Sequence, residues 1–197
     1  SYCDANNLKY VHISTDHFFD DKLDIHDEAC SVSLLNKYAE QKFVAESLVI
    51  NSNKDALVIR TSILGFKPDR SHTLLHWILS TLKYEKEIDG FIDSITSSID
   101  VDTLCLTILQ LLKIGEYGLY NIGCNHTFFK FELIKKCAEI TGAVCNIRPN
   151  KASILEVPRC NNCGLDVSKV QSKLRINMPE LKSSLNTLKV KEYYEKL

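Results

Sequence analysis

Residues 33–50 carry the stretch SLLNKYAEQKFVAESLVI, whose apolar residues recur with the spacing of an amphipathic helix. A short apolar run stands on each side of it: LKYVHIS at 8–14 and DALVIRTSILG at 55–65. Both runs contain β-branched residues and polar hydroxyl side chains near their ends, which is typical of a buried strand followed by a turn. Strand, helix and strand in this order predict parallel strands and an α/β fold.

The same alternation continues along the rest of the chain. We expect a third strand at 118–124, and helices at 71–83 with Ser71 as N-cap, at 99–115 with Asp100 or Asp102 as N-cap, at 131–142, and near 166–174 and 179–196. We expect a loop around Gly90, and a loop or a short extended stretch between Pro149 and Pro158. Three core strands are too few to cover both faces of a stable parallel sheet. The sequence therefore predicts a partial parallel sheet.

The composition excludes several classes of partner. The chain has 197 residues, 45% of them hydrophobic and 25% charged, which are ordinary values for a globular protein. Its net charge of −1 predicts neither nucleic-acid nor anionic-membrane binding. It has no apolar run long enough to span a membrane and no signal peptide, so we expect a cytoplasmic protein. Because the first residue is not Met, we expect the chain to begin within a longer protein.

Eight cysteines invite a disulfide or metal interpretation. Cys105 and Cys137 fall at apolar positions of expected helices, where cysteine behaves as a small hydrophobic residue, so we favour reduced thiols. Cys160 and Cys163 have the CxxC spacing of a metal knuckle. A structural zinc site needs four ligands, and no second CxxC or paired Cys/His cluster accompanies this one, so we expect no metal.

The chemistry of the chain is predicted from Tyr38 and Lys42, which are four residues apart and therefore share one helix face. A phenol is a weak acid, and a neighbouring ammonium stabilises its phenolate. Ser14-Thr15-Asp16 ends the preceding strand, where α/β sheets keep their ligand crevice, and the Thr15 hydroxyl could hold a carbonyl oxygen. This set suits ketone reduction, in which the phenol protonates the oxygen. Taken alone, YxxxK is more typical of an ordinary amphipathic helix surface than of catalysis.

Six segments, in this order, resemble motifs of the extended short-chain dehydrogenase/reductases, and within them the dTDP-4-dehydrorhamnose reductase-like sugar-nucleotide group. The matching segments are HISTDHFFD with STDYVFDG, LLNKYAEQKFVAE with NxYGxSKxxGE, VIRTSILGF with the RTS strand, IDGFIDSITSSIDVDTLC with DQxGxPTxxxDLA, GLYNIGCNHTFFKFELIKKCAEITG with GxYHxxGxxxxSWxEFAxxI, and RCNNCGLDVSKVQSKL with LDxSK. The resemblance covers residues 8–175.

The resemblance implies roles for individual residues. It assigns Thr15, Tyr38 and Lys42 to catalysis, Thr15, Asp16 and Ile63 to substrate binding, and Tyr38, Lys42 and Ser62 to cofactor binding. Tyr38 would be the general acid, and Lys42 would also bind the nicotinamide ribose. Ile63 stands where rhamnose-forming members carry an aromatic residue, so the resemblance leaves the identity of the sugar open.

The resemblance also implies NADP or NAD as cofactor and a nucleotide sugar as substrate. The chain carries no GxxGxxG turn, and its first strand aligns with the family's fifth. We therefore expect residues 1–66 to be the C-terminal part of a Rossmann-like domain, and 67–197 to hold the remaining strand with the substrate-binding and C-terminal helices.

On this interpretation the chain is the substrate-side portion of a reductase that lacks its N-terminal dinucleotide-binding half, and by itself it would be inactive. Its expected protein partner is that half or a second copy of the chain. The alternative is a non-catalytic sugar-nucleotide-binding or regulatory module that keeps the same fold.

Overall fold

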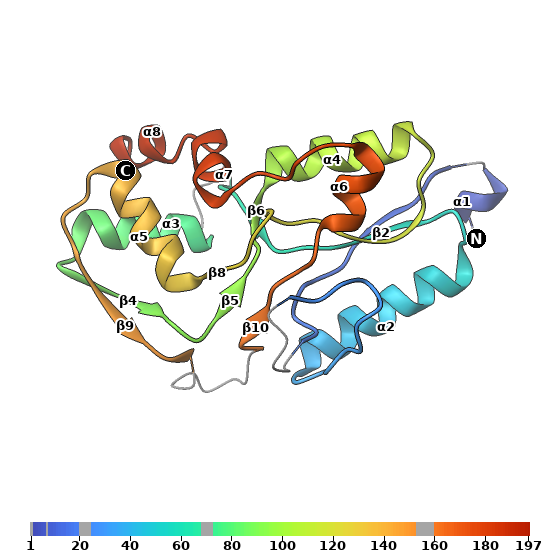
Figure 1. The fold of residues 1–197 in the computed structure, drawn as a ribbon, viewed down its shortest axis with the longest axis horizontal. Helices are drawn as coiled ribbons and strands as arrows, with labels where there is room; N and C mark the ends of the chain where they lie inside the picture. Colours follow the sequence, from blue (N-terminus) through green and yellow to red (C-terminus); the bar gives the residue numbers. More distant parts are fainter. Residues whose placement is uncertain (1, 7, 20–24, 68–72, 153–159) are drawn as a thin grey trace.

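Figure 1 shows the computed structural model of the chain, which describes residues 2–6, 8–19, 25–67, 73–152 and 160–197. The elements are α1 (Tyr2–Ala5), β1 (Val11–Ile13), α2 (Lys37–Ser52), β2 (Leu57–Arg60), β3 (Ile63–Leu64), α3 (Leu74–Tyr84), β4 (Glu87–Phe91), β5 (Ile95–Thr96), β6 (Ile99–Asp100), α4 (Val101–Lys113), β7 (Gly118–Asn121), β8 (Phe128–Phe129), α5 (Lys130–Thr141), β9 (Asn146–Asn150), β10 (Asn162–Cys163), α6 (Ser168–Leu174), α7 (Leu181–Thr187) and α8 (Val190–Glu195). No helix in these ranges is both long and apolar enough to cross a membrane.

One half of the molecule is built on a parallel sheet with strand order β1-β2-β7. Its register pairs Val11 with Leu57 and Val58 with Leu119. All four residues of β2 are buried because helices cover both faces: α2 lies on one side, and α4 and α6 lie on the other (Figure 1). The predicted α/β fold with parallel strands is therefore confirmed.

The other half gathers around the core of α3, α5, α7 and α8, at the opposite end of the molecule in Figure 1. The strands β4 and β9 pair in parallel over five residues beside these helices. Between the two halves lie short pairings, β3 with β6 and the order β10-β5-β8, which connect the end of the parallel sheet to the helical half.

Several sequence-based boundaries were wrong. The run 55–65 is two strands, because β2 ends at Arg60 and β3 pairs with a different partner, β6. The helix expected at 71–83 begins at Leu74, since the Thr73 hydroxyl caps it by accepting from the His76 amide at 3.2 Å. The Ser71 cap lies outside the described residues.

Two further expectations also failed. Gly90, expected in a loop, lies in β4, where it pairs with Pro149 of β9; of the two alternatives for the Pro149 segment, the structure shows the extended one. The last expected helix is divided into α7 and α8 by Lys189, whose φ of 52° is left-handed and interrupts the helical path.

Candidate active site

The carboxyl end of β1 leads directly into the Ser-Thr-Asp segment that is predicted to contact the substrate. Ser14, Thr15 and Asp16 are all buried. The Thr15 hydroxyl oxygen accepts a hydrogen bond from the backbone amide of His17 at 3.2 Å, which shapes a tight turn after the strand. Burial raises the pKa of Asp16 to about 6, against the opposing effect of nearby His17. The turn therefore presents the Thr15 hydroxyl and the Asp16 carboxyl in surroundings from which water is largely excluded.

Helix α2 aims the predicted Tyr38 and Lys42 toward this turn. The helix begins where it does because the Asn36 side chain accepts from the Ala39 amide at 2.9 Å. From the sixth residue of the helix, the Lys42 ammonium donates to the carbonyl oxygen of Ile13, the last residue of β1, at 2.5 Å. The half-buried lysine is thus held against the end of the strand.

Tyr38 lies one turn earlier on α2 and remains 54% exposed. Its ring stands edge-on to the imidazole of His17, with 6.3 Å between ring centroids. Since His17 follows Asp16 directly and its amide bonds to Thr15, the phenol belongs to the same neighbourhood as the strand-end turn. The structure brings the turn, the ammonium and the phenol to one edge of the sheet.

A buried ion pair behind this site escaped the sequence analysis. Glu46 and Arg60 are 2% and 3% exposed and pair at 2.6 Å, and the Ser14 hydroxyl donates to Glu46 at 2.7 Å. The apolar spacing of α2 gives no sign of it, because Glu46 is a charged residue that the structure nevertheless buries. Its partner lies fourteen residues away on β2. The pair joins α2, β1 and β2 directly beneath the site.

The end of β2 adds two more polar residues at the same edge. Thr61 is buried, and its hydroxyl has no hydrogen-bond partner among the described residues. Ser62 is half-buried, and its hydroxyl accepts from Ser98 at 2.7 Å, which leaves the Ser62 proton available to a ligand. Ser62 was predicted to bind the cofactor, and that role stays a prediction.

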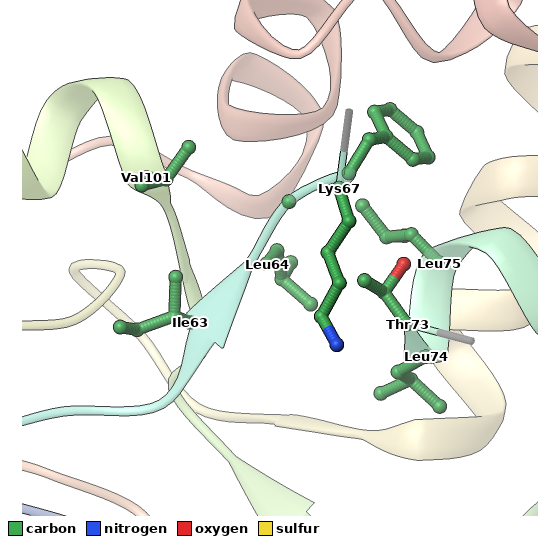
Figure 2. A pocket seen from close by; sticks show the side chains of 9 residues that line it. Ile63, Leu64, Lys67, Thr73, Leu74, Leu75 and Val101 are labelled. Atoms are coloured by element: carbon green, nitrogen blue, oxygen red, sulfur yellow. The ribbon is translucent and has the colours of Figure 1, made fainter. Parts of the chain in front are cut away.

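Ile63, the predicted substrate contact, is 48% exposed and borders a cavity of about 210 Å³. Figure 2 shows Ile63 on one side of this cavity and Thr73 and Leu74 of α3 on the other, with the Lys67 side chain extending between them. The walls are mainly apolar, and an ammonium is the charged group among them. Such a cavity suits a ligand with a flat apolar part and an anionic part.

Comparison with known proteins identifies the family. The model of the RmlD substrate binding domain matches residues 1–194. The chain belongs to this family. The RmlD-like assignment made from the six motifs is therefore confirmed, and with it membership of the short-chain oxidoreductases.

Individual relatives of this RmlD-family chain support the same assignment. The chain is 27% identical over 193 residues to the probable low-salt glycan biosynthesis reductase Agl14 of Haloferax volcanii, covering 94% of this chain and 64% of that protein. It therefore spans less than two thirds of the length of this curated relative.

Two solved structures share the fold. The dTDP-4-dehydrorhamnose reductase of Bacillus anthracis in complex with NADP superposes with a TM-score of 0.85 at 22% identity, covering 93% of this chain and 66% of that one. RMD of Pseudomonas aeruginosa complexed with NADPH gives a TM-score of 0.75 at 20% identity, covering 98% and 69%. These likenesses agree with the parallel-strand architecture of this RmlD-family member.

Proposed function

We propose that this chain supplies the substrate side of an NADPH- or NADH-dependent reductase that acts on a nucleotide-linked 4-keto-6-deoxysugar. The observation that carries the proposal is the bond from the Lys42 ammonium to the Ile13 carbonyl, because it fastens the YxxxK helix to the strand that ends in Ser-Thr-Asp. The names of the relatives support it, since Agl14 is called a reductase and two structural neighbours hold NADP or NADPH.

Thr15 is suited to hold the carbonyl oxygen of the substrate. Its oxygen already accepts from the His17 amide, so its own proton is directed away and can be donated to a ligand. Burial of this hydroxyl excludes competing water, which strengthens the hydrogen bond to the carbonyl.

Tyr38 then delivers the proton to that oxygen. The proton leaves the phenol as the carbonyl becomes an alcohol, and the remaining phenolate is stabilised by the ammonium of Lys42. Lys42 has three N–H donors, of which Ile13 uses one, so two remain for the phenolate and a ribose hydroxyl.

The residues present fit the nicotinamide-ribose end of a dinucleotide. Tyr38, Lys42 and Ser62 would hold this end, and the buried Thr61 hydroxyl at the same edge could accept or donate a further hydrogen bond. When bound, the nicotinamide supplies a hydride to the carbonyl carbon. The sequence has no GxxGxxG turn, so the pyrophosphate would be held by residues other than those of a glycine-rich loop in this chain.

The cavity beside Ile63 would take the nucleotide part of the substrate. Its apolar walls suit the flat face of a base, and the ammonium of Lys67 suits the charge of a diphosphate. Asp16, at the end of β1, would lie by the sugar hydroxyls.

Turnover of the full protein tests the proposal. The assay supplies NADPH and a nucleotide-linked 4-keto-6-deoxyhexose, and follows both NADPH oxidation and the reduced sugar. Tyr38→Phe removes the proton donor and should lower kcat about 10²–10⁴-fold with little change in KM. Tyr117→Phe, at another exposed tyrosine, is the control and should leave turnover unchanged. A Tyr38→Phe enzyme with near-normal kcat would exclude the assigned role, and wild-type binding of the sugar nucleotide without turnover would favour the non-catalytic alternative.

A further inference from the structure

Three metal-ligating side chains converge at a place that the reductase chemistry does not use. A ring nitrogen of His17 and the sulfur atoms of Cys160 and Cys163 all lie within 4.8 Å of one another. Both cysteines are buried and the histidine is half-buried. In the described ranges of the chain, this is the one group of three such ligands.

The separation of the three atoms is close to what a tetrahedral metal requires. Zinc binds sulfur at about 2.3 Å and nitrogen at about 2.0–2.1 Å, so tetrahedral ligand atoms lie roughly 3.5–3.8 Å apart. A contraction of about 1 Å, within reach of small side-chain rotations, closes the group onto one ion. Two thiolates and an imidazole form a soft ligand set that selects zinc over magnesium or calcium.

The backbone holds the ligands in place from both sides. Cys163 lies in β10, where it pairs with Thr96 of β5. The turn before it is fixed by the Asn162 side chain, which accepts from the Gly164 amide at 3.1 Å. On the other side, the His17 amide is bound to the Thr15 hydroxyl. Ligands on anchored backbone lose little freedom on binding an ion.

A dithiol switch is the competing explanation of a CxxC pair. The described cysteines form no disulfide. Formation of a Cys160–Cys163 disulfide would need an oxidant and would give His17 no part, whereas metal ligation uses all three converging groups. The convergence of the imidazole on the two sulfur atoms therefore favours the metal.

We propose that His17, Cys160 and Cys163 bind one zinc ion, with a fourth position open to water. Binding converts both thiols to thiolates and releases their protons to solvent. The ion would tie the turn after β1 to β10, segments far apart in the sequence. Because the His17 amide donates to the Thr15 hydroxyl, a metal on the His17 ring would also fix the segment that carries Thr15. The proposal is independent of the reductase assignment, because its test measures metal binding and not turnover.

Cobalt and zinc alone are the probes. The full protein is reduced, stripped with a chelator, and titrated with Co²⁺ and then with Zn²⁺. We expect one equivalent of cobalt to produce a thiolate-to-cobalt charge-transfer band with the strong visible bands of a tetrahedral ion, and one equivalent of zinc to remove them. Cys163→Ser and His17→Asn should each weaken the affinity more than about 100-fold, because even the loss of an outer-shell group weakens it about 10–100-fold.

Matched controls use residues of the same types elsewhere on the surface. Cys105→Ser and His126→Asn remove an exposed thiol and an exposed imidazole and should leave the titration unchanged. Circular dichroism checks that each variant is folded, and if either ligand variant is unfolded, the wild-type spectrum decides alone. Absence of the charge-transfer band at one equivalent overturns the proposal, as does unchanged affinity in folded Cys163→Ser. Isolation of a Cys160–Cys163 disulfide that takes up no metal after reduction also overturns it.

Discussion

Replacing Glu46 by Gln tests how much the buried Glu46–Arg60 ion pair, which joins α2 to β2, contributes to the free energy of unfolding. The Glu46 carboxylate accepts three contacts from the Arg60 guanidinium, at 2.6, 3.1 and 3.1 Å, and one from Ser14 at 2.7 Å. A carboxamide keeps the shape but leaves the guanidinium charge buried and uncompensated. Breaking one partner of such a pair lowers the free energy of unfolding by about 3–5 kcal/mol.

The aromatic residues around Arg60 place the expected loss in the free energy of unfolding near the lower end of this range, at about 3 kcal/mol. The guanidinium lies 5.3 Å from the centroid of Phe18 and 5.8 Å from that of Phe19, and cation–π attraction of about 1 kcal/mol remains in the variant. A loss of about 3 kcal/mol corresponds to a fall of about 1–1.5 M in the urea midpoint at a slope of about 2–3 kcal/mol/M. Urea unfolding followed by circular dichroism measures this shift.

Two further variants make the result specific. Glu40→Gln, on the same helix, breaks an exposed pair with Lys37 and should change stability by less than about 0.5 kcal/mol. The double variant Glu46→Leu with Arg60→Met replaces both charges by apolar groups and should recover at least about half of the loss. A urea midpoint that is unchanged in Glu46→Gln would refute the reasoning, as would a double variant less stable than Glu46→Gln.

Two other predictions concern packing and pH. Gly123→Ala should lower the free energy of unfolding by about 1–3 kcal/mol, because the new Cβ would lie 2.6 Å from the carbonyl oxygen of Ser97. In the control Gly65→Ala, the new Cβ meets nothing closer than 3.4 Å, so the free energy of unfolding should change little. Chemical denaturation of both variants makes the comparison. The hydrogen bond from Tyr120 holds the pKa of Glu116 below its ordinary value of 4.5. The stability that this bond contributes is therefore present above pH 4.5, and it is lost as the pH falls through the lower pKa of Glu116 in the folded protein. Tyr120→Phe should therefore be less stable than wild type at pH 7, with the difference shrinking in acid; a difference independent of pH between 3 and 7, in thermal melts, would contradict it.

The helices could be predicted because their signals are local. Asp100 or Asp102 was expected to cap α4, and the structure selects Asp100, whose carboxylate accepts from the Thr103 amide at 2.7 Å. The helix expected at 131–142 ends at Gly142, which adopts the left-handed φ of 71° typical of the residue that follows a helix. These features depend on residues within one turn of each other, so the sequence alone contains them.

The candidate site was predictable only in part, because some of its contacts join residues that are far apart in the sequence. Thr15, Tyr38 and Lys42 belong to one strand–helix unit, and their spacing placed them at one edge of the sheet. The partner of Glu46 lies on the next strand, so periodicity along α2 could not show that a carboxylate would be buried. His17 meets the Cys160–Cys163 pair only through the tertiary fold, so a sequence comparison of ligands near the CxxC motif does not include it.

The contact between the early loop and the late segment has a consequence for synthesis of the protein. His26 forms a parallel β-bridge with Leu165, and its ring nitrogen Nδ1 is hydrogen-bonded to the carbonyl oxygen of Gly164, 138 residues further along the chain. Leu165 also packs in the apolar cluster around Phe18 and Phe19. Ribosomes add about 5–20 residues per second, so the two phenylalanines are made roughly 7–29 s before Leu165, the residue that covers them. During that interval the nascent chain exposes an aromatic surface, and chaperones that bind such surfaces would find their site there.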